Sequence, residues 1–229
     1  MTFEAVLQDL GSLSKGDTHS HTGQWVAAQL RDRIAAGELV PGTKLSEEAL
    51  GEALGVSRNT LREAFATLHG EHIIARIPNR GVFVAKPDAD DVREIYRVRR
   101  FLEPAALMWH APAGVADLRG IVVAGRQAES CGDIAGMAAA NQEFHRAVVA
   151  RAGSERLDAL MAQVLAEMRL VFHAMGSDPA FHAPYLAENL KLIELLAAGE
   201  NAAAAELMRR YLDRAETQLL AALGAIPES

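Results

Sequence analysis

The chain has 229 residues and a formal net charge of −7 at pH 7; 50% of its residues are hydrophobic and 23% are charged. This balance is typical of packed globular domains and excludes a chain that is disordered throughout. No apolar run reaches the length of about 20 residues that a membrane span needs, and the N-terminus lacks the basic and apolar regions of a secretory signal. The single cysteine, Cys131, excludes an internal disulfide framework. We therefore expect a soluble, cytoplasmic protein of one or two domains with no membrane partner.

The acidic total conceals a basic segment. Residues 57–86 contain five arginine or lysine side chains and two glutamates, a net charge of +3, so the rest of the chain carries −10. Contact with nucleic-acid phosphates requires a local basic surface, whatever the sign of the total charge. The charge pattern therefore favours DNA binding by this segment.

Residues 1–22 are predicted to form a flexible N-terminal arm, because a short amphipathic stretch is followed by a segment rich in Gly, Ser, Thr and His. The pattern then becomes regular. Val26, Leu30 and Ile34 recur at helical spacing, and Gly37 lies where a helix would end. The first folded domain is therefore expected to begin at residue 23.

Two short helices with the same start signals follow. Ser46 and Ser57 are predicted N-caps, and each lies between two hydrophobic residues that can contact each other across the first turn. These pairs are Leu45 with Leu50 and Val56 with Leu61. After the second cap comes Arg58, whose positive charge opposes the helix dipole unless a polyanion lies opposite. Two short helices joined by a turn that contains glycine are typical of a helix-turn-helix.

The next segment predicts a β-hairpin with a basic tip. Two runs of β-forming residues, 73–77 and 82–84, are separated by Pro78-Asn79-Arg80-Gly81. Three helices followed by a hairpin make a winged helix. Residues 23–86 are therefore predicted to form a winged helix-turn-helix DNA-binding domain.

At this point the residues resemble the DNA-binding domain of the GntR family. The motifs that carry the resemblance are PG-x-x-L, GVSR-x-x-LREA and NRG, which appear in this order within residues 24–86. Two residues depart from the family pattern: Gly51 stands where alanine is usual, and His72 stands where a glycine usually opens the wing. Because histidine at positive φ is uncommon, the turn before the wing is left open between His72 and Gly70.

The helix-turn-helix pattern and the resemblance together place the DNA-reading residues. In the major groove arginine can bond to guanine and asparagine to adenine, while serine and threonine typically hold phosphates. The predicted contacts are Ser57, Arg58, Asn59, Thr60 and Arg62 on the second helix, with Arg80 and Gly81 at the wing tip. A further family contact falls on Glu48 and is not expected, because an acid would repel phosphate. Such proteins bind two half-sites as dimers, so the expected partners are double-stranded operator DNA with an imperfect palindrome and a second copy of the chain.

Residues 87–229 are predicted to form an all-helical domain. Asp88 and Asp133 are predicted N-caps, and Pro104 is predicted to kink or break a long first helix. Further amphipathic segments lie near 115–130, 133–151, 154–174, 180–198 and 201–223. YRVRRFLE at residues 96–103 and NQEFH at residues 141–145, with Asn189 and Tyr211, resemble the FCD domain of the FadR subfamily. The resemblance implies six or seven helices that bind an effector and dimerise, and hence a mainly α protein.

The resemblance also implies a metal site, which this chain does not preserve. Many FCD domains hold a divalent metal through an aspartate and a histidine four residues apart and two later histidines. The corresponding residues here are Asn141, His145, Asn189 and Tyr211. Zinc and nickel prefer imidazole, thiolate or carboxylate ligands, so we expect no metal, with zinc or nickel at the residual ligand His145 as the alternative. His145 is otherwise an interior histidine bonded to Asn189 or Tyr211.

The same four residues, with Arg99, are predicted to form a polar effector site. Arg99 resembles the family's carboxylate-binding arginine, and a guanidinium fork suits a carboxylate. Arg97 and Arg100 compete for this role, because the helix phase cannot be assigned to one residue from the sequence. The expected ligand is a small organic molecule with a carboxylate.

The sequence therefore predicts a DNA-binding transcription regulator, most often a repressor in this family, whose operator binding an effector modulates by shifting the helix near residues 88–110. Two alternatives remain open: a helical domain that serves only dimer assembly, and an enzyme fused to the helix-turn-helix. The sequence contains no P-loop, nucleophile elbow, HExxH motif or dinucleotide fingerprint, so catalysis is not expected.

Overall fold

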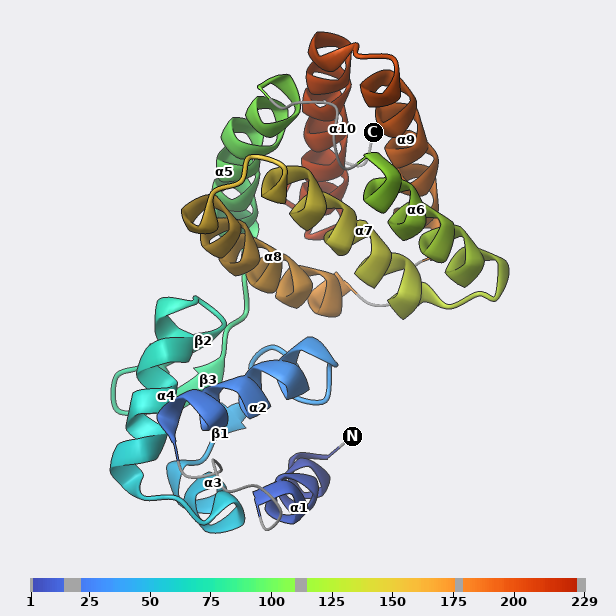
Figure 1. Ribbon diagram of the computed structural model, residues 1–229. Coiled ribbons are helices and arrows are strands. Elements are labelled where there is room, and N and C mark those ends of the chain that lie inside the picture. Colours follow the sequence, from blue (N-terminus) through green and yellow to red (C-terminus); the bar gives the residue numbers. More distant parts are fainter. Residues whose placement is uncertain (1, 15–21, 110–114, 176–178, 226–229) are drawn as a thin grey trace. The chain divides into compact units, whose positions relative to one another are not determined.

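A computed structural model describes residues 2–14, 22–109, 115–175 and 179–225 (Figure 1). This part of the chain contains ten α-helices and one three-stranded sheet. It divides into two compact units, the first within residues 1–87 and 166–174 and the second within 88–165 and 175–229. The predicted fold class, a winged helix-turn-helix followed by an all-helical domain, is confirmed. Among the described helices, none has the length and apolar character needed to cross a bilayer.

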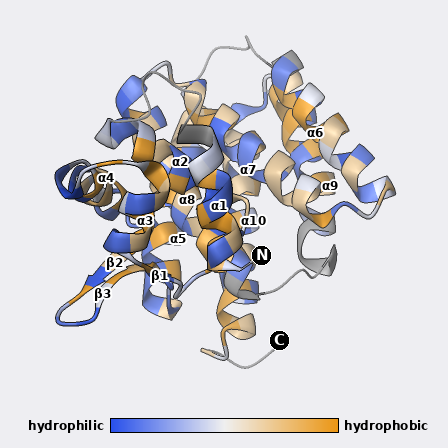
Figure 2. Cartoon of the chain, turned by 90° about the horizontal axis from the view of Figure 1, so that it is seen from below, coloured by the Kyte–Doolittle hydropathy of each residue, from blue (hydrophilic) through white to orange (hydrophobic). Residues whose placement is uncertain are grey.

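The first unit is built from four helices, the sheet and residues 166–174 of a fifth helix. The helices are α1 (Phe3–Ser14), α2 (Gly23–Ala35), α3 (Glu47–Leu54) and α4 (Arg58–Gly70), and the strands are β1 (Lys44–Leu45), β2 (Ile74–Ile77) and β3 (Gly81–Val84). The strands are antiparallel in the order β1-β3-β2. The predicted hairpin is therefore confirmed, and Figure 2 shows that the turn between β2 and β3 is hydrophilic. Strand β1 was not predicted, because two residues are too few to show a periodic pattern.

One apolar core holds this unit together. Leu30 of α2, Leu50 of α3 and Phe65 of α4 are fully buried, and Val84 of β3 is buried with them. Each of these helices therefore turns one apolar face inward and leaves a polar face for solvent.

The expectation of a flexible arm is corrected for residues 3–14. They form α1, which packs against α3, and its Val6 and Leu10 are fully buried in the core of the first unit. Burying one such side chain stabilises a fold by about 1.5–3 kcal/mol, which is enough to hold a short helix in place. Residues 15–21 of the predicted arm lie outside the described residues.

Both predicted serine caps of the helix-turn-helix are confirmed. The Ser46 hydroxyl accepts from the backbone N–H of Ala49 at 3.3 Å, and the Ser57 hydroxyl accepts from that of Thr60 at 3.2 Å. Between the two helices, Gly55 adopts a left-handed conformation with φ of +65°. This conformation ends α3 and suits glycine, which has no Cβ to clash.

The turn from α4 into the wing contains a left-handed residue that is not glycine. His72 has φ of +60°, whereas Gly70 is the last residue of α4, so the suggestion that Gly70 takes over is wrong. The backbone N–H of His72 donates to His69 and that of Ile73 donates to Leu68, at 3.1 and 3.2 Å. These bonds close the end of α4 and compensate for a conformation that costs an ordinary residue about 1–2 kcal/mol.

The second unit consists of helices. They are α5 (Ala89–Met108), α6 (Val115–Ser130), α7 (Ile134–Ala150), α8 (Glu155–Met175, of which 166–174 belong to the first unit), α9 (Pro179–Ala197) and α10 (Asn201–Ala222). All predicted helical segments are confirmed. Within this unit α5 packs mainly against α10, and α7 packs against α6 and α9. Helix α5 continues through Pro104, so of the predicted kink or break, the break does not occur.

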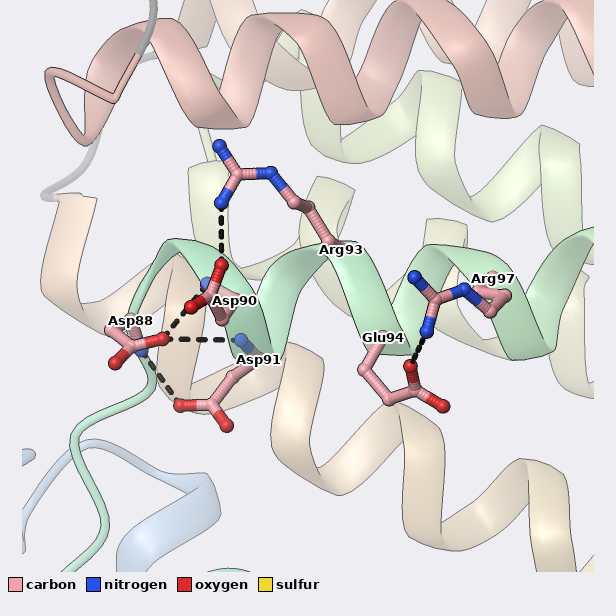
Figure 3. A network of polar contacts seen from close by, with 6 residues as sticks. All are labelled: Asp88, Asp90, Asp91, Arg93, Glu94 and Arg97. Atoms are coloured by element: carbon pink, nitrogen blue, oxygen red, sulfur yellow. Dashed lines mark hydrogen bonds and ion pairs between the residues drawn. The ribbon is translucent and has the colours of Figure 1, made fainter.

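Helix α5 begins with a reciprocal capping box, which confirms the predicted cap (Figure 3). The Asp88 carboxylate accepts from the backbone N–H groups of Asp90 and Asp91 at 2.8 and 3.1 Å, and the Asp91 carboxylate accepts from that of Asp88 at 2.8 Å. Two ion pairs follow along the helix, Arg93 with Asp90 and Arg97 with Glu94. These contacts fix where α5 starts, with four residues between the end of β3 and its first residue.

We expect Asp88→Ala to lower the free energy of unfolding by about 1–2 kcal/mol, because it removes the acceptor for two N–H groups of the first turn. Urea unfolding followed by circular dichroism measures the change. Asp90→Ala is the matched control: the Asp90 side chain is 91% exposed and its ion pair is worth under about 1 kcal/mol. An equal loss in both variants would contradict the role of the cap.

Candidate DNA-binding surface and buried polar site

The recognition face of α4 follows from the burial of its opposite face. The buried residues of α4 are Leu61, Ala64, Phe65 and Leu68. They fix the phase of the helix, so the predicted DNA-reading residues lie on its outer side. Ser57, Arg58, Asn59 and Arg62 are exposed, and Thr60 is partly buried.

The polar groups at the start of α4 differ in the contacts that they already make within the protein. The hydroxyls of Ser57 and Thr60 lie 2.9 Å apart and are already hydrogen-bonded. Arg62 pairs with Glu47 (Nε to Oε2, 3.5 Å) on the surface, a contact weak enough to be exchanged for a phosphate. Arg58 makes no ion pair within the described part of the chain, and its charge opposes the helix dipole. Arg58 therefore gains most from an anionic partner.

The wing presents its basic tip through two left-handed residues. Asn79 and Gly81 have φ of +63° and +110°, which place Arg80 between them in an exposed turn. The Arg80 guanidinium lies 5.8 Å from the ring centre of Phe83, a cation–π contact that supports its position. Sequence reasoning missed Lys44, which lies opposite Phe83 in β1 and beside Gly81. No pattern signalled it, because only strand pairing brings Lys44 next to the wing.

We expect Arg58→Ala to weaken binding to the specific operator by about 1–3 kcal/mol and to relax base preference there, because a bidentate contact to a base edge is lost. Fluorescence anisotropy with a duplex selected from a random pool measures the loss. Arg119→Ala, which removes an exposed arginine of α6, should bind like the unsubstituted protein. An equal loss on random DNA would make Arg58 a phosphate contact.

Six polar residues meet in the interior of the second unit, and we call them the polar cluster. Their side chains are almost completely buried. They are Arg99 and Glu103 of α5, Asn141 and His145 of α7, Asn189 of α9 and Tyr211 of α10. The structure brings together all five residues predicted for the effector site and adds Glu103.

The first half of the polar cluster is an ion pair joined to an imidazole. Arg99 Nε donates to Glu103 Oε1 at 2.6 Å, and Glu103 Oε2 lies 2.6 Å from His145 Nδ1. The Arg99 guanidinium also lies 4.9 Å from the ring centre of Tyr96. The charge of Arg99 is therefore balanced inside the protein before any ligand arrives.

The second half is a chain of neutral hydrogen bonds. His145 Nε2 lies 3.0 Å from the hydroxyl of Tyr211. This hydroxyl donates to Asn141 Oδ1 at 3.0 Å, and the same oxygen accepts from Asn189 Nδ2 at 2.8 Å. The polar cluster thus joins α5, α7, α9 and α10 through one continuous network.

The structure identifies which arginine of α5 faces inward. Arg99 is 3% exposed, whereas Arg97 is 66% exposed and Arg100 pairs with Asp213 of α10 at 2.7 Å. Glu103 was missed at the sequence level. The available signal was its spacing of four residues from Arg99, which places both side chains on one face of a helix.

Burial and charge together set the protonation of the polar cluster. Burial alone would raise the pKa of Glu103, but the charge of Arg99 and the hydrogen bonds from His145 and Arg99 outweigh it, so the pKa is lowered and the carboxylate stays ionised. Burial lowers the pKa of His145, and the neighbouring Glu103 offsets this only in part. Burial also raises the pKa of Tyr211 well above its usual range. A neutral His145 therefore carries its proton on Nδ1, because the ionised Glu103 can only accept.

Two buried polar atoms of the cluster are left over. Arg99 Nη2 and Asn189 Oδ1 have no hydrogen-bond partner among the described residues. A buried polar atom without a partner costs about 1–3 kcal/mol. The two atoms are suited to a ligand that offers an acceptor to Arg99 and a donor to Asn189.

The zinc or nickel ion of many FCD domains does not fit this cluster. Nδ1 of His145 is bonded to Glu103 and Nε2 lies against the Tyr211 hydroxyl, and the corresponding side chains around this histidine are two amides and a phenol. In the described chain, no group of three or more His, Cys, Asp or Glu side chains is placed to hold a metal. Amide oxygens supply no charge to a divalent ion.

We expect the stability of the protein to fall as the pH decreases below about 6.5, because the unfolded chain then binds a proton that the folded His145 site resists. The stability that the neutral His145 contributes is fully present above the pKa of histidine in the unfolded chain. It is lost as the pH falls toward the lowered pKa of His145 in the folded protein. The pKa of Glu103 is also lowered, so this group adds a further loss of stability at lower pH. Urea unfolding between about pH 5 and 8 measures it. His145→Gln should flatten this dependence, whereas His72→Asn, at an exposed histidine, should retain it. An unchanged profile in His145→Gln would refute the assignment.

An exposed basic recognition helix with a wing, and a separate helical unit with a buried polar cluster, define a two-domain DNA-binding regulator. Two family models match the chain. The model of bacterial regulatory proteins, gntR family, matches residues 22–84, and the FCD domain matches residues 94–214. The chain therefore belongs to the GntR family of bacterial transcription regulators and carries an FCD domain, as the sequence motifs predicted.

Solved structures and curated relatives agree with this assignment. The chain is similar to the structure of a GntR regulator from Rhodococcus sp. RHA1, with 40% identity and a TM-score of 0.82 over 89% of this chain and 98% of that one. Escherichia coli McbR/YncC, at 23% identity, shares the fold with a TM-score of 0.72 over 86% of this chain and 96% of that one. An HTH-type regulator from the TAR-I ttuE-ttuC' intergenic region of Agrobacterium vitis is 34% identical over 144 residues, which are 59% of this chain and 84% of the relative. The gluconate operon repressor of Bacillus subtilis is 38% identical over 96 residues, 42% of this chain and 39% of the relative.

Proposed function

We propose that the protein is a cytoplasmic transcriptional repressor of the FadR subfamily, which binds its operator as a homodimer and responds to a small organic effector with a carboxylate. The observation that carries this proposal is the polar cluster, where a buried arginine keeps one unpaired N–H group in the helical unit of a DNA-binding protein. A helical domain whose only role was to assemble the dimer would gain stability if apolar side chains replaced this cluster.

The groups left over in the polar cluster define the effector class. Glu103 occupies Arg99 Nε, so a ligand oxygen would accept from Nη2. A carboxylate is the strongest such acceptor. Asn189 Oδ1 would accept from a hydroxyl or amine of the same molecule. Small hydroxy or amino acids supply both groups.

Helix α5 offers a route from this site to DNA. It carries Arg99 and Glu103, and its first residue, Ala89, follows the wing after four residues. An effector that shifts α5 would change the position of the wing and the spacing of the two recognition helices in a dimer. Such coupling requires that the effector bind the two arrangements with different affinities.

The DNA partner follows from the exposed face of α4 and from the wing. Arg58, Asn59 and Arg62 would read or contact one major groove, Ser57 and Thr60 would hold phosphates, and Arg80 with Gly81 would meet the adjacent backbone or minor groove. A homodimer would place two such surfaces on half-sites about one helical turn apart, which requires an imperfect palindrome.

A second function has a specific observation in its favour. Most polar groups of the cluster already bond to one another, as expected of a helical domain that assembles the dimer and binds no effector. Catalysis has no such support: the matched families and the named relatives are transcription regulators.

We expect at least one of the hydroxy acids lactate and gluconate to raise the melting temperature, by about 5–10 °C at 100 times its Kd, and to change operator affinity. Arg99→Lys keeps a charge beside Glu103 but removes Nη2, so it should abolish the response. Arg97→Lys, on the exposed face of α5, should retain it. Light scattering of the same samples should give the mass of a dimer.

The possible contrary results separate the alternatives. A melting temperature that none of the acids changes would favour the assembly domain. Stabilisation by an acid without any change in operator affinity would refute the coupling through α5. A monomer that binds the operator would refute the homodimer.

A further inference from the structure

The three residues that depart from the metal-binding pattern are bonded to one another and to the histidine that remains. The Tyr211 hydroxyl lies 3.0 Å from both His145 Nε2 and Asn141 Oδ1, and Asn189 Nδ2 lies 2.8 Å from the same Asn141 oxygen. These are ordinary hydrogen-bond distances. The atoms at the positions of the family's metal ligands therefore bind each other.

Too few electron pairs remain in the cluster to hold a metal. The single proton of the Tyr211 hydroxyl is donated to Asn141 Oδ1, which also accepts from Asn189 Nδ2, so both lone pairs of that oxygen are used. His145 carries its proton on Nδ1 toward Glu103, and its Nε2 lone pair faces the Tyr211 oxygen. Among the four side chains this leaves one imidazole nitrogen and the unpaired amide oxygen of Asn189, fewer than the three or four protein ligands that zinc takes.

Charge also disfavours a cation in this cluster. Within the described residues the only carboxylate of the cluster is Glu103, and it is paired with the buried guanidinium of Arg99 at 2.6 Å. A divalent ion would therefore add two positive charges to a site whose own charges already cancel. Buried charges without partners are strongly unfavourable.

The phenol of Tyr211 is packed as well as hydrogen-bonded. It is 1% exposed, and its ring lies 5.1 Å from His145 and 4.7 Å from Tyr185 between ring centres. These are favourable distances for edge-on and tilted aromatic pairs. The ring thus contributes contacts in addition to the hydrogen bonds of its hydroxyl.

We propose that Asn141, Asn189 and Tyr211 replace the metal of the family: their hydrogen bonds hold α7, α9 and α10 together around His145 without any ion. Two consequences follow. The folded protein needs no divalent metal, and the substitutions Asn141→Asp, Asn189→His and Tyr211→His convert the cluster into a site for zinc, nickel or cobalt with His145 as the fourth ligand. This inference stands independently of the effector proposed above.

The first experiment uses the full chain without a purification tag, treated with EDTA and dialysed. Its melting temperature is measured alone and with excess ZnCl2 or NiCl2, and its metal content is measured before chelation. We expect no change in melting temperature and far less than one metal per chain. A stoichiometric metal whose removal lowers the melting temperature, and whose return restores it, would overturn the proposal.

The second experiment uses the triple variant N141D/N189H/Y211H. We expect zinc at 100 times its Kd to raise its melting temperature by about 5–10 °C, and cobalt to give visible absorption from a protein site. Adding His145→Gln to the triple variant should remove both effects, which separates this site from surface histidines. A folded triple variant that responds to none of the three metals would overturn the proposal.

Folding of the variant does not limit the test. If the triple variant is unfolded without metal, recovery of helical circular dichroism on addition of zinc supports the proposal. If zinc does not restore it, Tyr211→His alone gives the decisive result. That variant supplies two imidazoles, so zinc should stabilise it relative to Tyr211→Phe, and equal behaviour of the two variants contradicts the proposal.

Discussion

The helical unit depends on one buried ion pair, Arg99 with Glu103. Removing two charges from water costs several kcal/mol per ion, and the attraction between them compensates only if their other polar groups are also satisfied. His145 bonds the second carboxylate oxygen, and the ring of Tyr96 covers the guanidinium. Because loss of either charge would leave the other buried alone, the pair constrains the side chains that can surround it on α7 and α10.

The two units use arginine in opposite ways. Arg58 is exposed at the start of a helix. Its charge therefore attracts anions through water, and dissolved salt reduces the range of this attraction. Arg99 is buried, and its interactions depend on short distances and on the direction of each N–H group. The first arrangement suits a polyanion that approaches from solution, and the second suits contacts whose geometry is fixed by the fold.

Much of the fold could be predicted because its signals are local. Caps such as Ser57 and Asp88, and the residues of the wing turn, are determined by neighbours in the sequence. Contacts distant in sequence could not be predicted: α1 is held by a core formed from other helices, and Lys44 reaches the wing only through strand pairing. The polar residues of the site were recognised by motif, but Glu103 required knowledge of which face of α5 is buried.

The left-handed conformation of His72 has a consequence for the wing. A glycine at this position would act as a hinge, because it moves freely between backbone regions that a β-carbon forbids. Histidine restricts the backbone dihedral angles at position 72, between α4 and the wing, to a narrow range, although its left-handed conformation costs some backbone strain. The wing is then oriented relative to α4 when the domain folds and not when it meets DNA, so less conformational entropy is lost on binding. A stiff joint thus favours tight, geometrically selective binding over adaptation to operators of different groove width.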